Sequence, residues 1–155
     1  MTVAPLLAVS QGDPGGIGIE ITAKAWLRRQ DDALDPFFLI GHSQTIITQI
    51  HALLPDVPVI DIDTPAAARE VFTRALPVLP LDMALSPAAA TVAAIRHGAF
   101  LCKNGDARAL VTNPIHKKRL YEAGFDHPGH TEYLAALTGR PGKSVMMLAC
   151  PELRV

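Results

Sequence analysis

Three short segments of the chain combine residue types that could hold an anionic substrate or move a proton on it. The first, Ser10–Gly18, places Asp13 among four glycines. The second, Thr112–Lys117, reads TNPIHK, and the third, 126–132, reads DHPGHTE. Each segment leads into a stretch with a helical pattern, and the free N–H groups at a helix start favour phosphate or carboxylate.

The glycine-rich segment does not match either standard nucleotide loop. The Gly-Lys-Ser/Thr of a Walker A loop does not follow it, and glycines at 12, 15, 16 and 18 do not have the GxGxxG spacing. Spacing alone leaves two interpretations open. The glycines either make a tight turn between a strand and a helix, or they let a ligand approach backbone N–H groups.

The segment around Lys117 also has two interpretations. A lysine and backbone amides together could hold a phosphate, and a partly desolvated lysine could transfer a proton. The simpler interpretation is that Asn113 and Pro114 start a helix whose cationic face is solvated. Taken alone, the segment favours this second interpretation.

The third segment contains two histidines, His127 and His130. Histidines three residues apart can bind a metal from one helical face, but Pro128 and Gly129 separate these two, so the pattern disfavours a metal pair. Thr131 could cap a helix while the imidazole of His130 bonds to backbone, which would be a structural role. If His130 is functional, we expect it to bind substrate.

Composition limits the classes of protein that these segments could belong to. The 155 residues fit one domain, and 49% of them are hydrophobic, which is enough for a sizeable core. Fourteen basic and fifteen acidic residues leave a net charge of -1. No global field would attract nucleic acid or anionic lipid, so we expect neither a nucleic-acid nor a membrane partner.

Cysteine usage and the N-terminus suggest a cytoplasmic protein. Cys102 and Cys150 are far apart and form no CxxC pair. The apolar run near the N-terminus ends at Asp13 after about ten residues, which is short of the roughly 20 that a membrane span needs.

Apolar runs alternate with helical patterns along the chain. This alternation predicts an α/β fold, a three-layer α/β/α arrangement with a largely parallel or mixed sheet. Strands are expected at Leu6–Val9, Phe37–Ile40, Val57–Ile62, Ala109–Thr112 and Lys143–Cys150. Helices are expected at Ile17–Arg29, 43–54 with Ser43 as N-cap, 87–104 with Ser86 as N-cap, Pro114–Gly124 and 130–139.

The pattern also predicts a buried helix face near the N-terminus and a buried strand near the C-terminus, and it leaves one stretch unassigned. Ile17, Ile21, Ala25 and Leu27 can share one face at helical spacing, which is the pattern of a helix face that packs against the core. The stretch 64–87 contains four prolines and receives no assignment in its middle. The run Lys143–Cys150 is continuously apolar, which is typical of a strand covered on both faces, and the PELRV that follows looks like the start of another strand. The sequence thus suggests an architecture that is incomplete at its C-terminus.

Four motifs in this order resemble the N-terminal half of the 4-hydroxythreonine-4-phosphate dehydrogenase family of pyridoxal phosphate (vitamin B6) biosynthesis. They are GDPGGIGIE, ALVTNPIHK, AGFDHPGHTE and VMMLACPELRV, and the resemblance runs from about residue 8 to the end. The sequence departs from the family at Gln11, Gly15, Ile19 and His116, where proline, alanine, proline and asparagine are common. None of these departures removes a group with an expected chemical role.

The resemblance implies a fold and an activity. The family fold is similar to that of the isocitrate and isopropylmalate dehydrogenases, with two α/β/α lobes, a cleft between them and a homodimer. Members oxidise the 3-hydroxyl of 4-phosphooxy-L-threonine with NAD, and the β-keto acid loses carbon dioxide to give 3-amino-2-oxopropyl phosphate. Residues 1–155 would be the N-terminal portion of such an enzyme, with no complete second domain.

The resemblance also assigns site residues. The family's substrate-binding His-Thr pair falls on His130 and Thr131. Lys117 would support the anionic substrate electrostatically, Asp13 would shape the cleft, and these two are the candidates for catalytic residues. NAD and a divalent metal (Zn, Mg or Co) are the implied cofactors. Family members are about twice as long, and their metal ligands and NAD site lie beyond the equivalent of Val155.

Three alternatives remain open at this point. The substrate could be D-threonate or D-erythronate 4-phosphate, because dehydrogenases of these compounds share the same motifs. The chain could belong to a longer enzyme, as a fragment or an incomplete gene model, and we expect the 155 residues alone to be inactive. It could also be a short product that only binds a phosphorylated ligand or a partner.

Overall fold

A five-stranded parallel sheet forms the centre of the molecule. The computed structural model describes residues 6–140 and 142–155. The strands lie in the order β3-β4-β2-β1-β5, and every neighbouring pair is parallel. The prediction of a largely parallel sheet is therefore confirmed. The strands are β1 (Leu6–Ser10), β2 (Phe37–Gly41), β3 (Val59–Asp61), β4 (Leu76–Pro80) and β5 (Ala107–Thr112).

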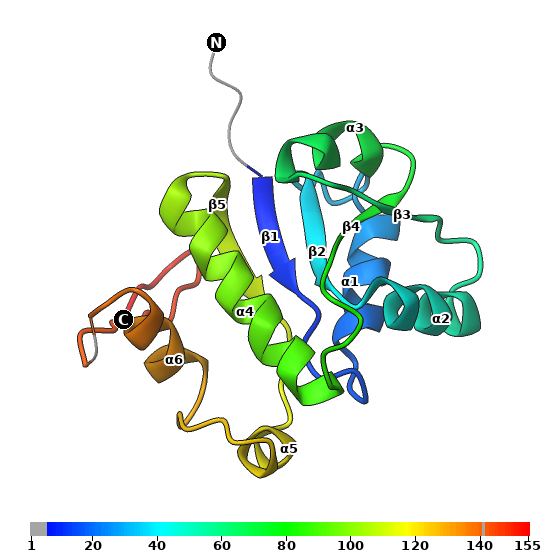
Figure 1. Cartoon of the computed structure of the whole chain (residues 1–155). Helices are drawn as coiled ribbons and strands as arrows, with labels where there is room; N and C mark the ends of the chain where they lie inside the picture. Colours follow the sequence, from blue (N-terminus) through cyan, green and yellow to red (C-terminus); the bar gives the residue numbers. More distant parts are fainter. Residues whose placement is uncertain (1–5, 141) are drawn as a thin grey trace.

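Helices cover both faces of this sheet, which confirms the three-layer arrangement (Figure 1). On one face lie α1 (Gly18–Leu27) and α2 (Ser43–Leu53). On the other lie a short 3-10 turn (Pro65–Ala67), α3 (Ala68–Phe72) and α4 (Pro87–Asn104). The last two helices, α5 (Lys117–Glu122) and α6 (His130–Leu137), pack against α4. Among the described residues, no helix has the length and apolar character needed to cross a membrane.

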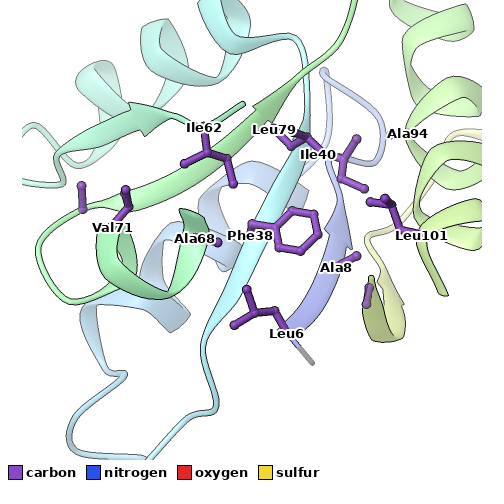
Figure 2. Packing of buried hydrophobic residues seen from close by; sticks show 12 residues of the cluster. Leu6, Ala8, Phe38, Ile40, Ile62, Ala68, Val71, Leu79, Ala94 and Leu101 are labelled. Carbon is purple, nitrogen blue, oxygen red and sulfur yellow. The ribbon is translucent and has the colours of Figure 1, made fainter. Parts of the chain in front are cut away.

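The core consists of two apolar clusters separated by the sheet. Alternate residues of β2 point to opposite faces, so Phe38 and Ile40 enter one cluster while Phe37 and Leu39 enter the other. Figure 2 shows the first cluster, where Phe38 lies between β1 and α3 and Ala94 of α4 closes one side. All five residues of β2 are buried, as expected for a strand in the middle of a parallel sheet.

The strand β4 lies in the stretch that the sequence left unassigned. Proline inside a strand normally argues against a central position because it cannot donate to the ladder. Here Leu76 N donates to Pro58 on the β3 side (2.8 Å), and the pairing with β2 begins only at Val78. Pro77 lies between these two residues, opposite Ile60 of β3, and precedes the first residue of β4 that pairs with β2.

The buried face of α1 differs from the expected one. Ile17 and Ile21 are exposed by 57% and 42%, and Ala25 is only partly buried. The opposite face enters the core, where Trp26 anchors it by donating from Nε1 to the Phe72 carbonyl oxygen (2.9 Å). The prediction failed because apolar residues occur on both faces of this helix. The buried face is the one that carries Trp26.

The predicted buried strand at Lys143–Cys150 is wrong. These residues are exposed, Val145 by 91%, and they do not join the sheet. The segment instead pairs with the residues that follow it, since Leu148 N donates to Val155 O (2.6 Å) and Cys150 N to Leu153 O (2.8 Å). Pairing across a short turn satisfies the backbone locally without burying the apolar side chains.

Helix starts were predicted with mixed success. Ser86 caps α4 as expected, since its Oγ accepts from Ala89 N at 3.3 Å. His42, and not Ser43, is the N-cap of α2, and the Ser43 hydroxyl donates to Asp61 (2.6 Å). The helix expected from Pro114 begins at Lys117.

Candidate functional site

The loops that follow β1 and β5 are hydrogen-bonded to each other at the carboxyl edge of the sheet. Asp13 N donates to the Pro114 carbonyl oxygen at 2.9 Å. Thr91 of α4 donates its hydroxyl to the Gly12 carbonyl oxygen, also at 2.9 Å. Parallel strands end at the same edge, so residues about a hundred positions apart meet where α/β proteins usually bind ligands.

The glycines in the first loop allow this close approach. Gly12 has φ +74°, and a Cβ there would lie 2.6 Å from the Pro114 carbonyl oxygen. A Cβ at Gly18 would lie 2.7 Å from the Gln11 carbonyl oxygen and 2.9 Å from the Asn113 Cβ. This close packing supports the tight-turn interpretation of the loop. At these positions glycine serves a tight turn packed against the neighbouring loop.

Asn113 links the same two loops from the inside. Its side chain is buried, and Nδ2 donates to Thr22 Oγ1 at 2.8 Å. The Thr22 hydroxyl in turn donates to the Gly18 carbonyl oxygen at 2.8 Å. Asn113 therefore helps to hold the start of α1, and it does not begin a helix as the sequence suggested.

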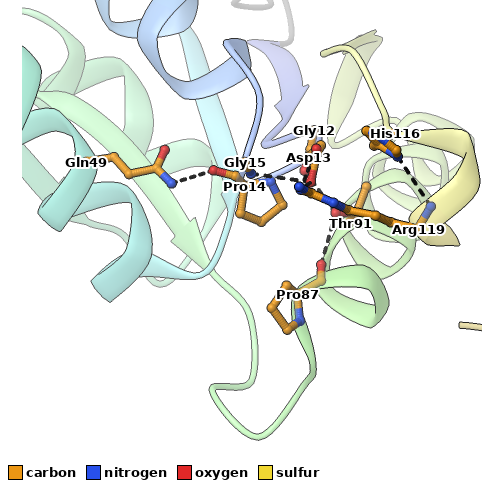
Figure 3. Close-up of polar contacts among 9 residues, drawn as sticks. All are labelled: Gly12, Asp13, Pro14, Gly15, Gln49, Pro87, Thr91, His116 and Arg119. Atoms are coloured by element: carbon orange, nitrogen blue, oxygen red, sulfur yellow. Dashed lines mark hydrogen bonds and ion pairs between the residues drawn. The ribbon is translucent and has the colours of Figure 1, made fainter.

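Asp13 forms an ion pair that the sequence analysis missed. Its carboxylate accepts from Arg119 Nη1, with distances of 3.1 Å to Oδ1 and 3.0 Å to Oδ2 (Figure 3). Oδ1 also accepts from Gly15 N at 3.3 Å. The Asp13 side chain is 14% exposed and that of Arg119 is 56% exposed. The carboxylate is thus neutralised by α5, an arrangement that suits a shaping role better than proton transfer.

A cavity of about 440 Å³ opens beside this ion pair. Asp13 and Pro14 line one side, the start of α4 at Ser86 and Pro87 another, and Arg119 a third. Figure 3 shows Arg119 reaching across from α5 to the glycine loop, with Pro87 on the α4 side. Arg119 adds a cation to this cavity, and the only sequence signal for it was the basic run 117–119.

Lys117 and His130 lie near each other although 13 positions separate them. Lys117 is the first residue of α5 and His130 the first of α6. A Cβ at Gly129 would lie 3.9 Å from Lys117 Nζ and 3.6 Å from Glu132 Oε2. An ammonium group that forms no ion pair within the described chain therefore lies beside the start of α6.

The electrostatic state of His130 follows from this neighbourhood. Burial lowers the pKa of its imidazole, and the positive charge of Lys117 lowers that pKa further. Both effects disfavour the imidazolium form, so His130 is neutral at neutral pH. Within the described residues its Nε2 is buried and has no hydrogen-bond partner. A neutral, unpaired ring nitrogen is suited to exchange a hydrogen bond with a ligand.

Asp13 and the Thr131 side chain make no polar contact with this pair within the described residues, although Thr131 is next to His130 in the sequence. No hydrogen bond or ion pair among the described residues joins Asp13 to Lys117, His130 or Thr131. Thr131 lines a separate groove of about 350 Å³ together with Arg140 and Lys143. The structure therefore groups Lys117 with His130 and places Asp13 and Thr131 at two different hollows.

His127 has a packing role. Its ring lies 5.4 Å from that of Phe125 and 5.1 Å from that of Tyr133, measured between centroids. In residues 6–140 and 142–155 no group of three or more His, Cys, Asp or Glu side chains is arranged to hold a metal ion.

Comparisons with known proteins agree with this architecture. A family model described as "Pyridoxal phosphate biosynthetic protein PdxA" matches residues 33–155. The chain belongs to this family. A 4-hydroxythreonine-4-phosphate dehydrogenase from Zymomonas mobilis is 43% identical over 96% of the chain and 46% of its own length. One from Methylorubrum populi is 44% identical over 92% of the chain and 45% of its own length.

A solved structure shows the same fold. A putative 4-hydroxythreonine-4-phosphate dehydrogenase from Salmonella typhimurium superimposes with a TM-score of 0.80 at 30% identity, over 97% of this chain and 50% of its own. The chain thus spans about half the length of the PdxA relatives that it matches. The resemblance that the four motifs suggested is confirmed.

Proposed function

We propose that residues 1–155 form the N-terminal portion of a two-lobed, NAD-dependent dehydrogenase that acts on 4-phosphooxy-L-threonine in pyridoxal phosphate biosynthesis. The reaction would oxidise the 3-hydroxyl to a ketone, and the β-keto acid would lose carbon dioxide to give 3-amino-2-oxopropyl phosphate. Membership of the PdxA family and the names of the relatives support the substrate. The observation that carries the site is the buried Nε2 of His130 beside the ammonium of Lys117, two groups that have no polar partner among the described residues.

Each candidate residue has a role that its surroundings allow. His130 is neutral and can hydrogen-bond to a substrate oxygen. Lys117 is exposed and would offset negative charge on the substrate. Thr131 would contribute its hydroxyl from the first turn of α6. Asp13 would act through Arg119, by holding α5 against the glycine loop.

The proposal places the binding sites for NAD and the divalent metal outside residues 1–155. The described residues do not fit a metal site, because no suitable group of ligands is present among them. We therefore derive no metal or hydride step from these residues. In the proposal, NAD and a divalent metal (Zn, Mg or Co) bind to the part of the enzyme that the relatives have beyond residue 155, and the enzyme works as a cytoplasmic homodimer.

A chimeric enzyme tests the proposed function directly. The matching portion of the Zymomonas mobilis relative is replaced by residues 1–155, and NADH formation from 4-phosphooxy-L-threonine is followed by absorbance. We expect turnover by the chimera and none by the 155-residue chain alone. A folded chimera without turnover, or NADH formation by the chain alone, contradicts the proposal.

Two further measurements on the chimera test the role of His130 and the identity of the substrate. His130→Ala should lower kcat/KM by about tenfold or more, the loss expected for one hydrogen bond to a charged substrate. His127→Ala is the matched control, since that imidazole packs against aromatic rings, and its kcat/KM should change less. D-Erythronate 4-phosphate is supplied in parallel, and faster turnover of this hydroxy acid would reassign the substrate.

A further inference from the structure

A hollow of about 450 Å³ lies between α4 and the segment that connects α5 to α6. It is separate from the site described above, because none of the candidate residues Asp13, Lys117, His130 and Thr131, all of them described by the structure, lines it. A hollow of this size is large enough for a small organic molecule. The chemistry of its lining indicates which kind of molecule would fit.

The hollow combines an aliphatic surface with an aromatic one. Small aliphatic side chains of α4 line one part of it, among them Ala89 and Val92. Another part is lined by three rings, those of Phe125, His127 and Tyr133. Each of these rings lies next to the other two, with centroids 5.0 Å, 5.1 Å and 5.4 Å apart. Rings that pack on one another hold a fixed surface, and such a surface favours a flat aromatic ligand over a flexible chain.

Two hydrogen-bond donors on this lining have no partner within the described protein. Tyr133 is only 8% exposed, yet its hydroxyl forms no hydrogen bond in residues 6–140 and 142–155. The guanidinium of Arg96 likewise forms no ion pair or hydrogen bond in this part of the chain. Burial raises the pKa of Tyr133 and the charge of Arg96 lowers it, so the guanidinium lies near the hydroxyl. A phenol and a guanidinium near each other are suited to donate together to a carboxylate.

Asp126 restricts the charge of the ligand. Its carboxylate also belongs to the lining, and within the described chain it forms no ion pair with Arg96. The charges of Arg96 and Asp126 cancel, so the hollow as a whole does not attract anions. A ligand with two negative charges would be repelled by Asp126 more strongly than a monocarboxylate. The lining therefore favours a single carboxylate next to Arg96.

We propose that this hollow binds a small aromatic carboxylate. The carboxylate accepts hydrogen bonds from the Arg96 guanidinium and the Tyr133 hydroxyl. The ring packs against the aliphatic side chains of α4 and the rings of Phe125 and His127. This ligand is distinct from the substrate of the proposed function, since none of the candidate residues lines the hollow.

Benzoate is the probe for this site, and the native 155-residue chain is titrated with it while NMR shifts are recorded. We expect saturable shifts at Arg96, Phe125, His127 and Tyr133. Arg96→Gln should weaken benzoate binding by about tenfold or more, since hydrogen bonds to charged groups are among the strong ones. Tyr133→Phe keeps the ring and removes only the hydroxyl, and it should weaken binding about three- to tenfold. Asp126→Asn should not weaken binding, because it removes a repulsive charge.

Two related compounds separate the contributions of the ring and the charge. Benzamide has the same ring without the negative charge, and cyclohexanecarboxylate has the same charge without an aromatic ring. Both should bind several-fold more weakly than benzoate, because each lacks one of the two features that the lining recognises.

A matched control separates a site from general surface charge. Arg74→Gln removes an exposed arginine that does not line the hollow, and it should leave benzoate binding unchanged. Thermal unfolding of each variant without benzoate checks that it remains folded. The proposal is overturned if binding does not saturate, if Arg96→Gln binds as tightly as the native chain, if Arg74→Gln weakens binding equally, or if either related compound binds as tightly as benzoate. The titration requires no turnover, so its result is independent of the chimera.

Discussion

The two ends of the candidate site are built differently. At the carboxyl ends of β1 and β5, most of the polar groups described above are used inside the protein, although the buried Nε2 of Gln11 has no hydrogen-bond partner among the described residues. Asn113 is hydrogen-bonded to Thr22, and the Gly12 carbonyl oxygen accepts a hydrogen bond from Thr91. Asp13 forms an ion pair with Arg119. At the starts of α5 and α6, Lys117 and the Nε2 of His130 remain without such partners in the described chain. Paired groups fix a geometry, whereas unpaired groups are free to bind a ligand.

The largest effect should come from breaking the first region at Gly12. Gly12→Ala combines an unfavourable φ of +74° with a Cβ only 2.6 Å from a carbonyl oxygen, and should lower the free energy of unfolding by about 2–4 kcal/mol. Gly105→Ala is the control, because Gly105 also has a positive φ, +84°, but nothing lies within 4 Å of its Cβ position. It should cost only about 1 kcal/mol. Urea denaturation measures both, and equal losses would show that close packing at Gly12 contributes nothing.

A smaller effect on the free energy of unfolding should come from the ion pair between Asp13 and Arg119, which joins the loop after β1 to α5. A double-mutant cycle of Asp13→Asn and Arg119→Gln should give a coupling of about 0.5–1 kcal/mol, modest because the arginine is more than half exposed. The comparison cycle uses Lys118 and Glu122, whose charged atoms are 4.0 Å apart and whose side chains are 81% and 64% exposed on α5. That pair should couple by about 0.3 kcal/mol or less. If the two cycles give the same value, Asp13 does not hold α5 in place.

The smallest effect on stability should come from the second region, through protonation of His130. Its pKa in the folded state is lowered by burial and by Lys117, so the unfolded state binds more protons as the pH falls. Stability is therefore fully present above the ordinary histidine pKa, and it decreases as the pH falls from there through the folded-state value. Burial also lowers the pKa of His97, which acts in the same direction.

Substitutions separate the contribution of His130 from that of His97. His130→Gln should reduce the loss of stability between neutral and mildly acidic pH, and His97→Gln serves as the comparison. Lys117→Met should raise the pKa of His130, measured by NMR titration of its imidazole protons. An unchanged pKa in that variant would mean that Lys117 lies too far from His130 to share a ligand with it.

Much of the fold could be predicted from local signals. The cap Ser86 with Pro87, the left-handed Gly105, and the alternation of apolar runs with helical patterns each act within a few residues. The strand β4 could not be predicted, because proline is tolerated there only through the pairing partners on each side. The buried face of α1 was missed for a similar reason, since it depends on the bond from Trp26 to Phe72, 46 positions away.

For the candidate site, the sequence alone supplied the chemical groups and the family. The motifs around Asp13, Lys117 and His130 are enough to identify the family, because residue types and short spacings are local properties of the chain. The tertiary structure decided which groups are free. Asp13 meets Arg119 from 106 positions away, and the pKa of His130 is lowered by Lys117 on another helix. Such pairings depend on distances in space between segments that only folding brings together.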